Sequence, residues 1–163
     1  MKIQLSIFFI FLFFCHKTDF NKLYSEALLD PNNVNNLNEV YKKSLSGDVN
    51  YFNNISYFVD ANNTMFLTTG KKKYLSYNLQ VVKNLNVSSV VTVESGQIIM
   101  KWFWRANRKN GIHEKLARKE VMLYEGYLLR HVAKFMYILD KNKNVLSKKE
   151  RDELDNAITY LQE

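Results

Sequence analysis

The chain of 163 residues has little cysteine, proline or glycine, with one, one and five of them. A single cysteine excludes a disulfide framework within the chain and a zinc site built from several cysteines. So few prolines and glycines exclude collagen-like and linker-rich chains and favour long helices. Aromatic residues, in contrast, make up 14% of the chain and apolar residues 47%, which is the composition of a folded globular domain.

The sequence also lacks the motifs of common catalytic and nucleotide-binding sites. It has no G-x-S-x-G, no P-loop and no G-x-G-x-x-G segment. Its three histidines, His16, His113 and His131, lack the spacing of H-E-x-x-H, so we predict no metal site and no cofactor. The net charge of +7 favours an anionic partner without identifying it.

The longest apolar run stands at the N-terminus. Residues 1–14 contain one lysine, Lys2, followed by an almost unbroken apolar stretch that stops at Cys15. The run is shorter than the roughly 20 residues that span a bilayer, and it has the pattern of a signal peptide. We therefore predict an exported protein with a signal peptide over residues 1–14. A plain N-terminal helix of the core is the alternative.

The only cysteine lies where this run ends. Leu12, Phe13, Phe14 and Cys15 resemble a bacterial lipobox, in which the cysteine receives diacylglycerol and becomes the first residue after cleavage. The resemblance implies lipidation of Cys15 and a lipid anchor in a bacterial membrane, at the outer membrane or the cell surface. Residues 15–38 would then be a tether and lead-in. Because Phe13 and Phe14 are bulky where the pattern has a small residue, a periplasmic or secreted protein is the alternative.

Apolar residues recur at helical spacing through most of residues 39–163, which predicts one all-α domain. Gly47 and Gly70 are expected to end the first two helices, Asp48 to begin the second, and Leu85 to lie near the end of the third. A fourth helix is expected after Glu114. Its apolar positions are Leu116, Val121, Tyr124, Leu128, Val132, Phe135 and Leu139.

The pattern changes between the third and the fourth helix. Residues 87–104 are rich in β-branched and aromatic side chains, which predicts an extended insert or a short hairpin around Ser95 and Gly96. Further on, Ser147 and Glu150 have the spacing of a capping box and predict the start of a last helix. The many asparagines are interrupted by aliphatic residues throughout, and we interpret them as codon bias.

The turn between the second and third helices resembles a known architecture. Five residues match the turn of one repeat of an (α/α)-toroid carbohydrate-active protein: Thr69, Gly70, Lys73, Tyr74 and Leu75. Residues 123–139 resemble the first helix of the next hairpin. The resemblance implies helical hairpins of an incomplete (α/α)-toroid, similar to the N-terminal part of a polysaccharide lyase, glycoside hydrolase or uronyl epimerase that is a bacterial lipoprotein.

The predicted helices are too few to close such a ring. We therefore expect a fragment of a larger enzyme that acts on an acidic polysaccharide, inactive by itself. Apolar faces at the open edge of the ring would lack partners, so self-association is an expected consequence.

The basic and aromatic stretch after the insert is the predicted substrate-binding site. Trp102 and Trp104 are two residues apart, which places them on one side of an extended chain, and Arg105 and Arg108 follow. Indole rings stack on sugar rings and guanidinium groups pair with carboxylates or sulfates, so we predict an acidic glycan as the partner. Packing of the tryptophans in the core is the alternative. An exported protein rarely meets nucleic acid, so we expect no nucleic-acid partner.

The toroid resemblance also implies candidate catalytic residues. Lyases and epimerases of that architecture use Tyr, His and Arg around an acidic sugar, and these roles would fall on Tyr127 as donor, His131 as base and Arg130 as carboxylate clamp. Core packing of the tyrosine and a structural bond of the histidine are the alternative. The sequence thus predicts an exported, membrane-tethered carbohydrate-active or acidic-glycan-binding protein. A non-enzymatic helical lipoprotein that acts as a binding or structural module is the alternative function.

Overall fold

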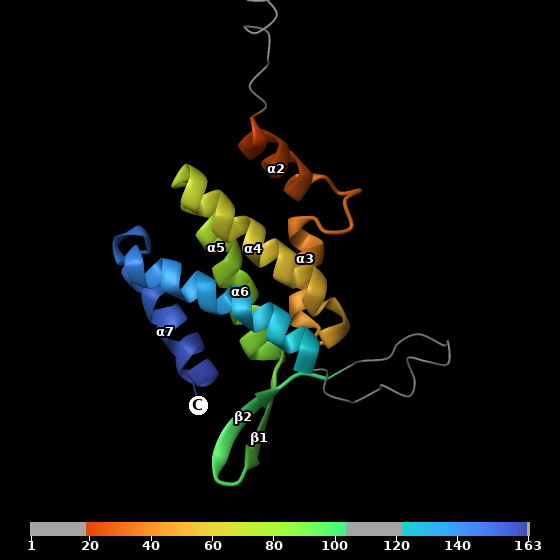
Figure 1. Ribbon diagram of the computed structural model, residues 1–163, viewed down its shortest axis with the longest axis vertical. Helices are drawn as coiled ribbons and strands as arrows, with labels where there is room; N and C mark the ends of the chain where they lie inside the picture. Colours follow the sequence, from red (N-terminus) through yellow and green to blue (C-terminus); the bar gives the residue numbers. More distant parts are fainter. Residues whose placement is uncertain (1–18, 104–121, 163) are drawn as a thin grey trace, which may run out of the picture.

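The computed structural model describes residues 19–103 and 122–162. These residues form six α-helices and one two-stranded sheet, which confirms the predicted all-α class (Figure 1). In this part of the chain no helix is long and apolar enough to cross a membrane. The predicted signal peptide over 1–14 and the lipidation of Cys15 lie outside the described residues.

The helices pack in two layers that alternate along the chain. In one layer α4 (Phe52–Thr69) and α6 (Met122–Lys141) lie side by side and run in the same direction (Figure 1). In the other layer α5 (Lys73–Ser88) contacts both α3 (Leu37–Leu45) and α7 (Lys148–Gln162). Because α5 also packs against α4 and α6, it lies at the centre of the bundle.

Local sequence sets the ends of the helices as expected. The Asp48 carboxylate accepts a hydrogen bond from the backbone N–H of Asn50 and begins the short 3₁₀ helix η1 (Val49–Tyr51), after which α4 starts. α4 ends at Gly70, whose φ of 67° favours glycine. The next helix starts within three residues, so that α4 and α5 form a tight hairpin.

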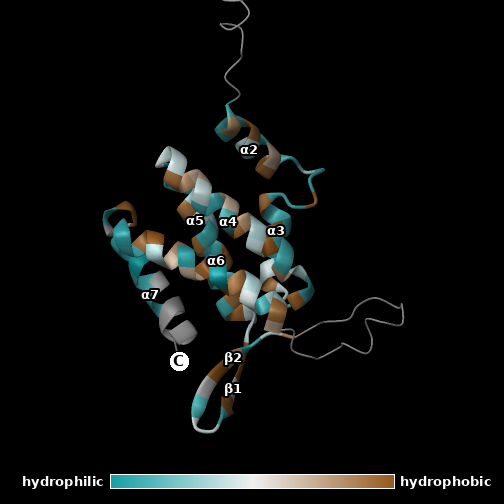
Figure 2. Cartoon of the chain, in the orientation of Figure 1, coloured by the Kyte–Doolittle hydropathy of each residue, from teal (hydrophilic) through white to brown (hydrophobic). Residues whose placement is uncertain are grey.

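The insert after α5 is an antiparallel hairpin. β1 (Val90–Glu94) pairs with β2 (Gln97–Lys101), and the turn residues Ser95 and Gly96 have φ of 52° and 80°. Two successive positive φ values are the geometry that a two-residue hairpin turn needs. The hairpin projects from one end of the bundle, and hydrophobic residues occupy much of its two strands (Figures 1 and 2). The side chain of Val93 is 71% exposed there.

The lead-in contains a helix that packs on the bundle. α2 (Phe20–Leu29) begins at Asp19, whose carboxylate accepts from the backbone N–H of Lys22. It ends at Leu29, because the residue before a proline, here Asp30 before Pro31, disfavours helical backbone. The side chain of Leu28 is buried among the core residues, so this part of the expected tether belongs to the folded domain.

Three asparagines lie fully buried between the two layers. Asn62 and Asn63 of α4 and Asn78 of α5 have no exposed surface. The Asn78 Nδ2 donates to Asn63 Oδ1 and to the carbonyl oxygen of Val59, each at 3.0 Å. The Asn78 Oδ1 in turn accepts from Asn62 Nδ2 at 3.2 Å. We call these three side chains the asparagine network.

The asparagine network reaches two further helices. The Tyr24 hydroxyl of α2 donates to Asn62 Oδ1 at 3.2 Å, and Asn63 Nδ2 donates to the backbone carbonyl of His131 in α6 at 3.1 Å. One connected set of hydrogen bonds therefore joins α2, α4, α5 and α6. A buried amide that loses its partner costs about 1–3 kcal/mol, so these bonds select which faces of the helices meet.

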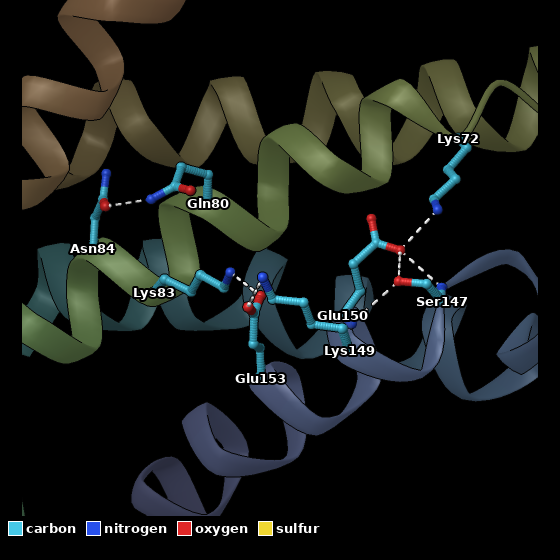
Figure 3. Close-up of polar contacts among 8 residues, drawn as sticks. All are labelled: Lys72, Gln80, Lys83, Asn84, Ser147, Lys149, Glu150 and Glu153. Atoms are coloured by element: carbon cyan, nitrogen blue, oxygen red, sulfur yellow. Dashed lines mark hydrogen bonds and ion pairs between the residues drawn. The ribbon is translucent and has the colours of Figure 1, made fainter.

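α7 is held against α5 by charged side chains (Figure 3). Glu150 Oε2 accepts from Lys72 Nζ and from the Ser147 hydroxyl, each at 2.7 Å, and Lys83 pairs with Glu153 one turn further along α7. The backbone N–H of Glu150 donates back to the Ser147 hydroxyl at 3.3 Å, which confirms the predicted capping box. Hydrogen bonds from Lys72 and Ser147 lower the pKa of Glu150 to about 2.

We expect Asn78→Leu to destabilise the fold by about 3 kcal/mol, because it leaves Asn62 Nδ2 and Asn63 Oδ1 buried without partners. Urea unfolding followed by circular dichroism measures this change. The matched control is Asn54→Leu at an exposed position of α4, which we expect to change stability by less than about 0.5 kcal/mol. Equal effects of the two substitutions would contradict the structural role of the asparagine network.

The docking of α7 is expected to weaken in acid. A carboxyl group whose pKa is lowered in the folded state stabilises that state while it is ionised. The contribution of Glu150 is therefore complete above its usual pKa of 4.5 and is lost as the pH falls towards about 2. Urea midpoints of the wild type and Glu150→Gln should differ at neutral pH and converge over this window. A difference that persists at the acid end would contradict this assignment, and Glu39→Gln serves as the exposed control.

Candidate functional site

The structure places Trp102 in the core. Its indole is only 4% exposed, its Nε1 donates to the carbonyl oxygen of Leu85 at 3.0 Å, and its ring meets Phe52 edge-on with 5.6 Å between the ring centroids. Such a buried indole offers no open face to a sugar ring, so Trp102 supports the fold. The other residues predicted for this site, Trp104, Arg105 and Arg108, lie outside the described residues.

The candidate catalytic residues come together on α6. The Arg130 guanidinium lies 5.7 Å from the centroid of the Tyr127 ring, and its Nη2 lies 2.9 Å from His131 Nε2. Tyr127 is 40% exposed, so its ring does not pack in the core. The structure therefore groups these three side chains, with Tyr127 and Arg130 exposed and His131 largely buried.

Asp60 of α4 joins this cluster, although sequence reasoning missed it. Its Oδ1 lies 3.2 Å from His131 Nδ1 and 2.9 Å from Lys134 Nζ. Burial raises the pKa of Asp60, but the hydrogen bonds from Lys134 and His131 and the positive charge of Lys134 outweigh burial and hold that pKa below its usual value. Asp60 and His131 are far apart in the sequence, and only the side-by-side packing of α4 and α6 brings them into contact.

These contacts define the protonation of His131. A guanidinium group only donates, so His131 Nε2 accepts from Arg130 and the ring proton resides on Nδ1, facing the Asp60 carboxylate. Asn63 holds the backbone carbonyl of the same residue. Both ring nitrogens therefore have partners, and His131 could act as a base only after Arg130 leaves Nε2.

Aromatic and cationic side chains share the open face of α6. They recur at steps of three and four residues, which places them on one side of the helix. We call this set the α6 stripe; its members are Tyr127, Arg130, Lys134, Tyr137 and Lys141. The Lys141 ammonium lies 5.5 Å from the Tyr137 ring centroid, which repeats the arrangement of Arg130 on Tyr127. The stripe is about 20 Å long and contains no acidic residue.

A hollow of about 260 Å³ lies between the end of α2 and the start of α3, lined in part by Leu28, Pro31 and Leu37. None of the predicted site residues lines this hollow. Over residues 19–103 and 122–162, no group of His, Cys, Asp and Glu side chains is arranged to hold a metal ion. The α6 stripe and its neighbours are thus the best-defined candidate site in the described part of the chain.

No known protein family, curated protein or solved structure matches the chain. The side chains of the α6 stripe are therefore the basis for proposing a function.

We expect Asp60→Ala to change the tautomer of His131, because the substitution removes the acceptor that faces Nδ1. The ring proton should then redistribute between Nδ1 and Nε2. Long-range ¹⁵N–¹H NMR correlations of the imidazole measure this distribution, with Asp152→Ala on α7 as the control. A wild-type ring protonated on Nε2, or an unchanged spectrum in Asp60→Ala, would contradict the described geometry.

Proposed function

We propose that the protein is an exported, membrane-tethered module that binds acidic glycans along the α6 stripe. The observation that supports this proposal is the repeated pairing of a tyrosine ring with a cation on one open helix face. Tyrosine rings stack on the apolar faces of sugar rings, and arginine and lysine bind carboxylate or sulfate groups. Each tyrosine–cation pair thus provides a ring for the apolar face of the sugar and a positive charge for its acidic group.

Arg130 is the main anion-binding residue of the proposal. A guanidinium group has five N–H donors in a planar fork, and among the described residues only the contact of Nη2 with His131 occupies one of them. Its remaining donors suit a bidentate pair with a carboxylate. The basic net charge of +7 adds long-range attraction for an anionic polymer.

The length of the α6 stripe favours a polymer over a single sugar. Tyr127 and Tyr137 lie ten residues apart, about 15 Å along the helix, so one chain of several sugars would contact both rings. Linked contacts of this kind raise the overall affinity above that of either contact alone. An open stripe with weak individual contacts is therefore sufficient for binding.

The (α/α)-toroid architecture belongs to the same proposal. In such a ring, successive helices alternate between an inner and an outer layer. The alternation of α4 and α6 with α3, α5 and α7 is compatible with this arrangement. It supports a relationship to carbohydrate-active toroids, in which Tyr127, Arg130 and His131 would face an acidic sugar.

A non-enzymatic interaction module is the second candidate function. In the described part of the chain, the sheet consists of β1 and β2 alone, so each strand has an open edge, and Val91 and Val93 are exposed. Open edges pair readily with a further strand, and pairing of two copies of this chain is the simplest case. A module that works through the hairpin alone would bind no glycan on α6.

We expect Arg130→Ala and Tyr127→Ala each to weaken the binding of polyuronate or sulfated oligosaccharides by about tenfold, because each removes one half of a tyrosine–cation pair. Isothermal titration calorimetry with the full chain measures this. Lys42→Ala, at an exposed cation on α3, is the control that should leave affinity unchanged.

Two results would contradict the proposed function. The first is glycan binding that is equal in the wild type, Tyr127→Ala and Arg130→Ala. The second is stronger binding of a single-stranded nucleic acid than of any acidic glycan, since an aromatic and cationic surface also suits that polymer.

A further inference from the structure

α2 has a second apolar face that the bundle does not cover. Phe20, Leu23 and Ala27 recur at steps of three and four residues, and we call them the α2 stripe. Phe20 is 73% and Leu23 is 52% exposed. Hydrophobic and hydrophilic residues alternate on this helix (Figure 2). Contiguous exposed apolar side chains on an amphipathic helix mark an interaction surface.

The opposite face of α2 is fixed to the bundle by specific bonds. The Tyr74 hydroxyl donates to Asn21, Lys73 Nζ donates to the Ser25 hydroxyl at 2.8 Å, and the Tyr24 and Tyr74 rings are 5.9 Å apart. At 100° per residue, Asn21 and Ser25 lie about 100–160° around the helix from Phe20 and Leu23, and Tyr24 lies between the two faces. The bundle therefore holds α2 in an orientation that keeps the α2 stripe turned outward.

Two properties of the surrounding chain identify the partner. The apolar run over residues 1–14 ends six residues before Phe20, so an extended chain places α2 within about 22 Å of the end of that run. Lys22 on α2 is exposed, although it pairs with Glu26 at 3.9 Å, and Lys71 is exposed two residues before Lys73, which bonds to Ser25 of α2. An amphipathic helix with an exposed apolar stripe beside a membrane-directed segment is suited to a lipid surface, and exposed lysines add attraction for anionic headgroups.

We propose that the α2 stripe docks on the surface of a lipid bilayer and orients the domain against it. Phe20 and Leu23 enter the boundary between headgroups and acyl chains, while Lys22 and Lys71 contact anionic headgroups. Since α2 and the hairpin lie at opposite ends of the molecule, the hairpin then points away from the bilayer (Figure 1). This inference rests on the membrane tether of the proposed function and adds a second contact to it.

The test uses the full chain in vesicles of phosphatidylethanolamine with a minority of phosphatidylglycerol. Single cysteines are placed by Leu23→Cys, Leu29→Cys or Tyr57→Cys in a Cys15→Ser background, which also removes the predicted lipid anchor, and carry an environment-sensitive fluorophore. Leu29 is an exposed residue of α2 about 120° around the helix from Leu23, and Tyr57 is an exposed residue of α4. We expect nitroxide-bearing lipids to quench the label at position 23 about threefold more strongly than the labels at 29 and 57.

Three outcomes would overturn the inference. If the protein floats with the vesicles while lipid quenching at position 23 equals that at 29 and 57, another part of the chain holds it on the lipid and the docking fails. A label at 23 that both lipid quenchers and aqueous iodide fail to reach would show that protein, such as a second copy, covers the α2 stripe. Protein that stays out of the vesicle fraction would show that the α2 stripe does not bind lipid, and flotation of the lipidated wild type would then report on the tether alone. Glycan titration of the same samples reports on the α6 stripe separately.

Discussion

The fold depends on one constraint: three uncharged amide side chains, Asn62, Asn63 and Asn78, are buried where the two helical layers meet, and each needs a partner. Apolar contacts tolerate sliding and rotation of one helix on another, whereas a buried amide penalises every arrangement that leaves it unpaired. Here the three side chains satisfy one another and also bind Tyr24 of α2 and the backbone of His131 in α6. These polar groups would destabilise the core if they were unpaired. Because they are paired, they fix the register in which the helices pack.

This constraint connects the interior with both candidate surfaces. The bond from Asn63 to the His131 carbonyl fixes α6 beside α4, which brings Asp60 to His131 and sets the direction in which the α6 stripe faces. The bond from Tyr24 to Asn62 does the same for α2, because it holds one face of that helix inward and leaves Phe20 and Leu23 outside. The α6 stripe and the α2 stripe then have fixed positions relative to each other.

Much of the fold could be predicted from local sequence, because the signals act over a few residues. Gly70 ends α4, the pair Ser95 and Gly96 turns the hairpin, and Ser147 with Glu150 begins α7. The asparagine network could not be predicted in the same way, since its members resemble a compositional bias until their partners on other helices are known. Asp60 could not be predicted for the same reason, because its partner His131 lies on another helix. Local sequence also left open whether Trp102 stacks on a ligand or packs in the core, because its environment is formed by the start of α4 and the end of α5.

The rate at which the Asn78 side-chain amide protons exchange with deuterium tests the central role of the asparagine network most directly. Both Nδ2 protons of Asn78 are donated to buried acceptors, so NMR should show that they exchange with deuterium only through global unfolding, as slowly as the most protected backbone amides of α5. The exposed side chain of Asn54 gives the reference rate in the same sample. Exchange of the Asn78 protons at a rate near that of Asn54 would contradict the account.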